Sequence, residues 1–320
     1  MLIVQKFGGS SLKDPERLRH VAQLVRRERE RAELVVVVSA MGDTTDSLTD
    51  RAREMNDRPS PRELDALVTT GEQQAAALLV MTMEQLGLPA VSLTGWQAGI
   101  FTDTHFGDGE IRVIEPRRIR RELSLGFVPV VTGFQGVCAA GDITSLGRGG
   151  SDTTAVALAA ELEADGCDIY TDVDGIYTAD PRAIPEARLL PEIDTRDMLA
   201  LSKAGSRVLH AKSVELALAG NVPLRLLSSF REGTGTTVKL LPESRRPRLA
   251  GITGRAETGK ISLAGKGADA SALSEAVLLL SKAGIAVTDG TLGENVMTLT
   301  VKKEDHPKAM QILHDGMIPK

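Results

Sequence analysis

Two glycine-rich segments carry the charged side chains best suited to binding an anion. Residues 6–11, Lys-Phe-Gly-Gly-Ser-Ser, follow a short apolar run; their glycines let backbone N–H groups approach an anion, and Lys6 adds a mobile positive charge. Residues 147–154, Gly-Arg-Gly-Gly-Ser-Asp-Thr-Thr, add a guanidinium that can bind a carboxylate through two hydrogen bonds, just before an expected helix. The first segment could also be a plain strand-to-helix turn, whereas the second favours anion binding.

Acidic and hydroxyl side chains stand in three further places. Glu72 enters an otherwise apolar helix, where a cationic ligand group would offset the cost of burying its charge; an acid favoured by the helix dipole is the other explanation. Residues 39–46 place small hydroxyl side chains directly after the apolar run 35–38. Residues 168–182 form an acidic segment with two tyrosines. Such a segment is suited to contacts with adenine, ribose and metal-bound phosphate, although it can also be an ordinary long loop.

These parts match phosphoryl transfer to a carboxylate better than other chemistries. Such an acceptor is already ionised, so that positioning and charge neutralisation suffice and no general base is needed. The chain contains no G-x-x-x-x-G-K-[ST] loop and no G-x-S-x-G motif, and its five histidines show no metal-ligand spacing. A Walker-type phosphate loop is thereby excluded, and hydrolase and zinc chemistry have little support.

A dinucleotide-binding motif is the main competing pattern. Gly265-x-Gly267-x-x-Ala270 fits the glycine fingerprint, and Asp289 stands where a ribose-binding acid would be expected. Against this, residues 290–320 have the pattern of a hairpin and one short helix, which leaves no room for the remaining parallel strands. A plain strand-to-helix turn is the simpler interpretation.

The elements that must position these residues alternate between strands and helices. Asp14 and Pro15 form a typical helix start, and Gly87 a typical helix end. We expect strands at 2–7, 34–38, 90–93, 127–131, 167–171 and 222–227, and helices at 15–31, 71–86, 153–163 and 208–219. This order predicts an α/β fold, a mostly parallel sheet sandwiched by helices with ligands at the carboxyl ends of the strands.

A second, smaller domain is expected at the C-terminal end. Residues 241–248, Leu-Pro-Glu-Ser-Arg-Arg-Pro-Arg, are polar and without periodicity, so we place a linker at 241–250 between domains at 1–240 and 251–320. Strands are expected at 261–264, 285–287 and 296–301, and helices at 271–283 and 307–313. The order βαββα suits a small α+β sandwich.

Composition limits the partners and the compartment. The 320 residues are 42% hydrophobic and 25% charged, with a net charge of −5, which argues against nucleic acid or an anionic membrane as the main partner. Cys138 and Cys167 are the only cysteines, too few for a disulfide framework. With no export signal and no apolar run of about 18 residues, we expect a cytoplasmic protein.

Taken together and in this order, the motifs resemble those of the aspartate kinases. They are residues 6–11, 38–42 (Val-Ser-Ala-Met-Gly), 70–72 (Thr-Gly-Glu), 94–100 (Thr-Gly-Trp-Gln-Ala-Gly-Ile), 133–134 (Gly-Phe), 146–155, 170–182 and 207–210 (Arg-Val-Leu-His). The resemblance implies the amino-acid-kinase fold and ATP-dependent formation of 4-phospho-L-aspartate, the first step towards lysine, threonine and methionine. Another carboxylate kinase of the same fold and a catalytically silent amino-acid sensor are the alternatives.

The resemblance also implies roles for particular residues. Lys6 and Asp152 would be the catalytic pair. L-Aspartate would be held by Ser39, Thr45, Glu72, Phe134, Arg148, Gly149 and Ser151, with Glu72 on the ammonium and Arg148 on a carboxylate. ATP would be bound by Gly8, Gly9, Ser10, Thr171, Asp172, Tyr177, Arg182, Arg207 and Val208. Mg²⁺ would arrive with ATP, without a dedicated set of protein ligands.

The resemblance weakens towards the C-terminus. Members of the family usually carry two small ligand-binding ACT modules, and here only residues 261–313 are similar to one, with the last strand missing or reduced to residues 317–319. In a homodimer, the single modules of two chains would pair and so rebuild the sheet that paired ACT modules share. Whether lysine or threonine acts as an effector stays open.

Overall fold

The computed structural model describes residues 1–319, which form two compact units. Unit 1 contains residues 1–172 and 219–233, and unit 2 contains residues 173–218 and those from 234 onward. The expected linker at 241–250 lies inside unit 2 rather than at a division between units. The assignment of 1–240 and 251–320 to separate domains stays a prediction.

Unit 1 is built on parallel strands in the order β11-β9-β1-β2-β6-β3. Their bounds are Leu2–Phe7 for β1, Glu33–Val38 for β2, Ala90–Leu93 for β3, Val128–Thr132 for β6, Gly166–Thr171 for β9 and Leu224–Ser228 for β11. All six expected strands in this region are confirmed to within about two residues at each end. Because the strands are parallel, their carboxyl ends lie at one edge of the sheet.

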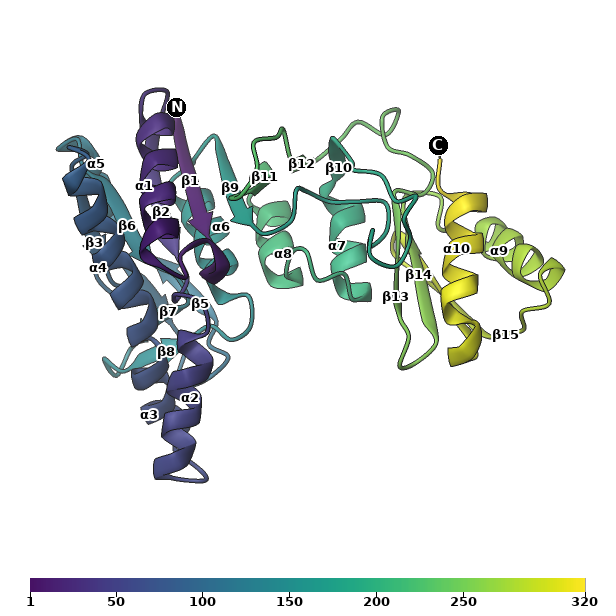
Figure 1. Ribbon diagram of the computed structural model, residues 1–320, viewed down its shortest axis with the longest axis horizontal. Helices are drawn as coiled ribbons and strands as arrows, with labels where there is room; N and C mark the ends of the chain where they lie inside the picture. The colour runs from purple at the N-terminus through teal and green to yellow at the C-terminus, as the bar shows by residue number, and fades with distance from the viewer. Residues whose placement is uncertain (320) are drawn as a thin grey trace. The chain divides into compact units, whose positions relative to one another are not determined.

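Helices cover both faces of this sheet. Helices α1 (Pro15–Arg29) and α4 (Thr70–Gln85) lie side by side (Figure 1) and pack on one face, which includes Phe7. Successive strand residues point to opposite faces, so Lys6 faces the other way, towards α6 (Gly150–Glu161). The predicted start of α1 is confirmed, since the Asp14 side chain accepts a hydrogen bond from the Arg17 backbone N–H at 2.9 Å.

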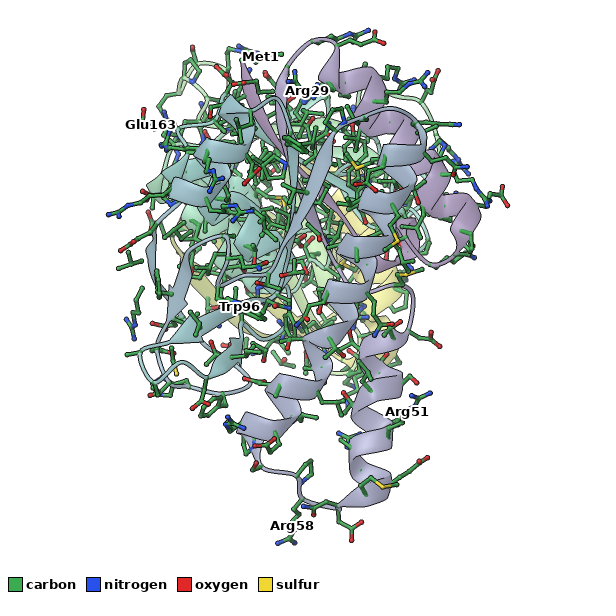
Figure 2. All side chains as sticks on the ribbon, turned by 90° about the vertical axis from the view of Figure 1, so that its left-hand side faces the viewer. Met1, Arg29, Arg51, Arg58, Trp96 and Glu163 are labelled. Atoms are coloured by element: carbon green, nitrogen blue, oxygen red, sulfur yellow. The ribbon has the colours of Figure 1, made fainter. Side chains whose placement is uncertain are left out.

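Unit 1 contains further elements that we did not predict. A second sheet has the order β5-β4-β7-β8. Its strands are β4 (Ile100–Thr102), β5 (Ile111–Ile114), β7 (Gln135–Cys138) and β8 (Ile143–Ser145), and the added helices are η1 (Gly9–Ser11), α2 (Thr44–Met55), α3 (Pro61–Val68) and α5 (Arg117–Ser124). Helices α2 and α3 form a projection, and Figure 2 shows Arg51 and Arg58 there, at the opposite end of the view from Met1.

Unit 2 contains a parallel strand pair and a small antiparallel sheet. The pair is β10 (Glu192–Asp194) and β12 (Thr236–Lys239), accompanied by α7 (Thr195–Ala204) and by α8 (Ala211–Ala219) as far as Leu218. The antiparallel sheet has the order β13-β14-β16-β15, with β13 at Gly251–Arg255, β14 at Lys260–Ala264, β15 at Val287–Gly293 and β16 at Val296–Val301. Helices α9 (Ala270–Lys282) and α10 (His306–Met317), with the short η2 (Lys303–Asp305), complete a fold consistent with an ACT-like domain.

The antiparallel sheet overturns the dinucleotide-binding interpretation of residues 265–270. A dinucleotide fold needs parallel strands around this turn, whereas β14 pairs antiparallel with both of its neighbours. The glycines serve packing instead, because a Cβ added to Gly265 would lie 2.4 Å from the carbonyl oxygen of Arg248. The plain-turn interpretation is the correct one.

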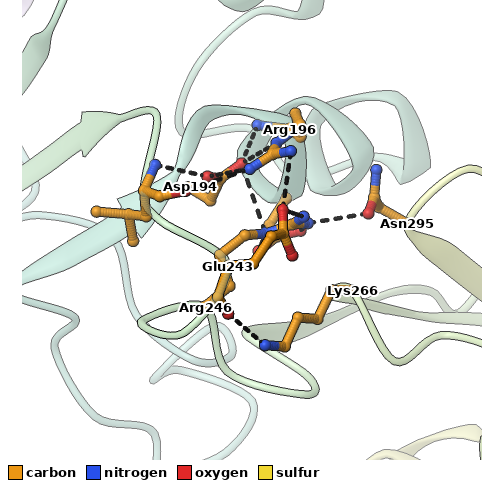
Figure 3. A network of polar contacts seen from close by, with 8 residues as sticks. Asp194, Arg196, Glu243, Arg246, Lys266 and Asn295 are labelled. Carbon is orange, nitrogen blue, oxygen red and sulfur yellow. Dashed lines mark hydrogen bonds and ion pairs between the residues drawn. The ribbon is translucent and has the colours of Figure 1, made fainter.

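Residues 241–250 are packed within unit 2 by a buried polar network (Figure 3). The Arg246 side chain is only 4% exposed, and its guanidinium donates to Asp197 at 2.5 Å, to Asn295 at 2.9 Å and to Glu243 at 3.0 Å. Arg246, one of the three arginines in this polar stretch, therefore lies inside the unit, where it neutralises the buried carboxylate of Asp197.

Candidate active site

Lys6 and Asp152, the pair predicted to be catalytic, form an ion pair. Lys6 comes from β1 and Asp152 from the first turn of α6, and the Lys6 Nζ lies 2.7 Å from Asp152 Oδ1. Their side chains are only 12% and 16% exposed, so the pair is largely removed from water. Segments that are about 145 residues apart in the sequence thus bring together a positive and a negative group at the carboxyl end of the sheet.

Glycines shape the approach to α6. Gly147 and Gly149 have φ values of +71° and +74°, a backbone conformation that other residues adopt only with strain. Gly149 is the N-cap and has no side chain to cap the first turn, which leaves that positive end of the helix dipole without a side-chain acceptor. Arg148 stands exposed between them. The segment can therefore offer both backbone N–H groups and a guanidinium to an anion.

The turn after β1 is fixed by the ends of two neighbouring strands. Gly8 donates its N–H to the carbonyl of Tyr170 at 3.3 Å. A Cβ added to Gly9 would lie 2.7 Å from the carbonyl oxygen of Ala40, so no larger residue fits there without a backbone shift. Ser10 is exposed on the same turn. These close contacts hold the turn beside Lys6, in the place expected for a phosphate-binding segment.

Glu72, in the first turn of α4, has a buried carboxylate with a hydrogen-bond partner on only one of its two oxygens. One of its oxygens, Oε1, accepts a hydrogen bond from the Ala40 N–H at 2.9 Å, whereas Oε2 is buried without a partner. The residue is 3% exposed, and burial raises the pKa of its carboxyl to about 7 against the opposing hydrogen bond from Ala40. A buried acceptor of this kind fits a cationic donor such as an ammonium group.

The remaining residues predicted for aspartate lie around the same strand ends. Ser39 follows β2 and donates its N–H to the carbonyl of Phe7 at 3.1 Å, and Thr45 lies in the first turn of α2. Phe134 follows β6 with a φ of +95° and donates its N–H to the Thr154 hydroxyl. A Cβ added to Gly133 would lie 2.7 Å from Ser151 Oγ, which shows how closely this turn approaches α6.

The residues predicted for ATP are divided between the two units. Thr171 ends β9 in unit 1, and its hydroxyl donates to the neighbouring Asp172 at 3.1 Å. Tyr177, Arg182, Arg207 and Val208 belong to unit 2. Arg182 is held by Asp180, with Nε and Nη2 at 3.0 and 2.8 Å from the two carboxylate oxygens.

Asp65 is a supporting residue that our sequence analysis missed. Its carboxylate is 2% exposed and accepts hydrogen bonds from the N–H groups of Gly107 and Ser145 at 2.9 and 2.8 Å and from the Ser145 hydroxyl at 2.7 Å. Asp65 thereby anchors β8, which leads into the glycine segment at 147–150. The available signal was an acid within the short run Leu-Asp-Ala-Leu-Val at 64–68.

Other features of residues 1–319 do not form competing sites. No group of three or more His, Cys, Asp or Glu side chains in this range could hold a metal ion. No helix within the described residues has the length and apolar character needed to cross a membrane. A cavity of about 210 Å³ lies among Met1, Ile3, Gln5, Glu28, Arg31, Ala32, Leu34 and Arg225, and no residue predicted for the site lines it.

Comparison with known proteins gives consistent matches. Residues 1–228 match the amino acid kinase family. An aspartate kinase of Pseudomonas putida is 45% identical over 98% of this chain and 78% of its own length. An aspartokinase of Geobacillus stearothermophilus is 44% identical with the same coverages.

Solved structures agree with the sequence matches. The aspartate kinase of Synechocystis superposes with a TM-score of 0.69 at 31% identity, covering 100% of this chain and 70% of that chain. Aspartokinase III of E. coli, in complex with aspartate and ADP, superposes with a TM-score of 0.86 and covers 100% of both chains. At 21% identity, the second likeness supports the fold alone.

Proposed function

The chain belongs to the amino acid kinase family and is an aspartate kinase, and we propose that its phosphoryl transfer depends on Lys6 and Asp152. The Lys6 ammonium neutralises charge on the phosphoryl group as it passes from ATP to the side-chain carboxylate of L-aspartate. Asp152 holds that ammonium in place through the 2.7 Å ion pair. This ion pair is the observation that carries the proposal, because preorganised charge is what this reaction needs.

Aspartate would be oriented by charges at both of its ends. The unpartnered Oε2 of Glu72 accepts from the substrate ammonium, which offsets the cost of the buried carboxylate. The exposed guanidinium of Arg148 binds a substrate carboxylate at the N-terminal end of α6. The site is completed by Ser39, Thr45, Phe134, Gly149 and Ser151.

ATP would be bound through its phosphates and its nucleoside by separate groups of residues. The backbone N–H groups of Gly9 and Ser10 contact the phosphates beside Lys6, and Gly8, whose own N–H donates to Tyr170, adjoins them at the start of the turn. The nucleoside contacts are assigned to Thr171, Asp172, Tyr177, Arg182, Arg207 and Val208. Mg²⁺ would arrive with ATP as part of the substrate, without a dedicated set of protein ligands, and would supply further positive charge beside the phosphates.

The test is coupled ADP release with three acceptors and one substitution. Aspartate is expected to support turnover, whereas glutamate and N-acetylglutamate are not. Lys6→Met should remove most of that turnover while circular dichroism shows an intact fold. Wild-type activity in Lys6→Met would refute the assigned role without affecting the assignment as an aspartate kinase.

We also propose a homodimer in which the C-terminal modules of two chains pair, and we place it in the cytoplasm, where ATP is available. Strand β15 lies at the edge of the four-stranded sheet and is largely exposed, so a second copy could extend that sheet. Sedimentation should show a dimer at assay concentrations, and a monomer would contradict the pairing. Lysine and threonine, added singly and together to the assay, test whether either is an effector: a fall in turnover would identify one, and unchanged turnover would exclude both.

A further inference from the structure

The segment that carries Tyr177 is part of the hydrophobic core of the C-terminal module, defined here as residues 249–318. Ala179 and Ile184, at 5% and 1% exposure, belong to the same buried cluster as Ile252 of β13 and Leu313 of α10. All of these residues lie in unit 2. A loop that side chains of the module bury in this way has little conformational freedom of its own.

Thr178, the residue after Tyr177, is held by the module through both its side chain and its backbone. Its Oγ1 lies 3.0 Å from Nε2 of His314 on α10, and both residues are buried, at 2% and 5% exposure. Its carbonyl accepts the N–H of Ile252 at 2.8 Å. The Arg188 N–H donates to Thr178 Oγ1 at 3.0 Å, which closes the loop on itself. The backbone that presents Tyr177 is therefore fixed by contacts from β13 and α10.

The strand β13 also contacts the segment before Arg207, the other part of unit 2 that is assigned to ATP. Gly205 ends α7 with a φ of +117°, two residues before Arg207. A Cβ added to Gly205 would lie 2.6 Å from Nε of Arg255 on β13. The same strand, β13, thus contacts the segments before Arg207 and after Tyr177.

We propose that His314 and Thr178 are positioning residues for ATP, because the bond between them holds the loop that presents Tyr177. This inference rests on the nucleotide role proposed above for Tyr177. A loop that is ordered before binding loses less conformational entropy when ATP arrives, and it therefore binds more tightly. Breaking the bond between His314 and Thr178 frees the loop without removing any group that would touch ATP.

The test is a set of substitutions read out by steady-state kinetics. Thr178→Val and His314→Leu both break the bond between these two residues; the valine keeps the shape of threonine but also removes the acceptor of the Arg188 N–H, so its effect should be at least as large as that of His314→Leu. Each should raise the KM for ATP by about 3- to 10-fold, the range expected for one buried hydrogen bond. The KM for aspartate should stay unchanged, and kcat should change by less than about 2-fold. His314→Gln, whose amide can replace Nε2, should stay near the wild type.

His306 provides the matched control. It is also buried on α10, at 7% exposure, but its Nε2 lies 3.2 Å from the carbonyl of Lys260 on β14. His306→Gln should lower Tm without raising the KM for ATP. The inference is overturned if Thr178→Val leaves the KM for ATP unchanged, or if His306→Gln raises it as much as His314→Leu does. If His314→Leu fails to fold, the KM for ATP of Thr178→Val, compared with that of the His306→Gln control, still tests the positioning role.

Tyr177→Ala separates this inference from the function on which it rests. If Tyr177→Ala raises the KM for ATP and Thr178→Val does not, the positioning role is wrong and the nucleotide role stands. If Tyr177→Ala has no effect while Thr178→Val and His314→Leu raise the KM, the role of Tyr177 is wrong, and the loop is positioned for contacts made by its other atoms.

Discussion

Glu72 receives a hydrogen bond from the backbone of Ala40 on only one of its two carboxylate oxygens. The other oxygen is buried without a partner, and burial raises the pKa of the group to about 7. Near neutral pH, both the protonated and the ionised form of Glu72 are therefore present in the ligand-free protein. A substrate ammonium that reaches Oε2 would favour the ionised form, which links aspartate binding to pH.

We first predict that aspartate binds more tightly as pH rises. The ammonium prefers ionised Glu72, whereas its own charge stays constant, so the KM for aspartate should fall several-fold between about pH 6 and about pH 8. Steady-state kinetics at saturating ATP measures this. Glu72→Gln should have a high KM for aspartate with no such pH dependence. A wild-type KM that is flat across this range would contradict the assignment of Glu72 to the ammonium.

The same carboxylate should destabilise the ligand-free protein at high pH. A carboxyl group whose folded pKa is raised stabilises the fold below its unfolded pKa, and that stability is lost as pH rises from the ordinary value of 4.5 to about 7. Glu72→Gln should therefore raise the free energy of unfolding at about pH 8 by up to about 3 kcal/mol, and by much less at about pH 5. Denaturant unfolding at both pH values gives this difference. An equal effect at both values would show that the Glu72 charge is not costly in the fold.

The sequence predicted the central sheet well because its strands are buried on both faces. Runs such as Leu34–Val38 are continuous and apolar, and Asp14 and Pro15 mark a helix start by local chemistry alone. The second sheet escaped prediction because β4 and β8 have only three residues each, too few for a period. Strand β13 was missed because Gly-Ile-Thr-Gly-Arg contains no apolar run. Its position depends on pairing with β14 rather than on its own composition.

For the site too, residues marked by the local sequence could be predicted, and residues whose roles depend on tertiary contacts could not. Lys6 and Arg148 could be identified because glycines around them mark turns at strand or helix ends. The positive φ of Phe134 could not be predicted, because the sequence shows no glycine or asparagine at that position, and the close approach of Gly133 to Ser151 depends on how α6 packs. The role of Asp65 also depends on tertiary contacts, because its partners are 42 and 80 residues away in the sequence.

Turnover should depend on Lys6 and Asp152 as a unit. Lys6→Met should lower kcat by at least about 100-fold, because a preorganised charge at the reacting group is lost. Asp152→Asn should lower kcat less, since the ammonium stays present but is held less firmly. The double variant should be no slower than Lys6→Met alone, because both substitutions remove the same interaction. Lys13→Met, at an exposed position beyond the turn, is the control and should keep wild-type kcat. Additive losses in the double variant would mean that the two residues act independently.

The stability of unit 2 should depend on Arg246 far more than on its neighbour Arg245. Arg246→Met leaves Asp197, which is fully buried, without its cation, and burial already raises the pKa of this carboxyl against the effect of the guanidinium. Breaking such a buried pair costs about 3–5 kcal/mol. Arg245→Met removes only the ion pair between a half-exposed arginine and Glu192, and it should cost less than about 1 kcal/mol.

A second substitution distinguishes a lost charge partner from lost packing in this network. Adding Asp197→Leu to Arg246→Met removes the unpaired carboxylate, so the double variant should unfold at a higher denaturant concentration than Arg246→Met alone. If packing of the long arginine side chain were the main contribution, the second substitution would destabilise the protein further. Because Arg246 lies among residues from α7 and from the turn between β15 and β16, the loss should appear in amide exchange at both places. Increased exchange confined to residues 241–250 would contradict a connecting role for this arginine.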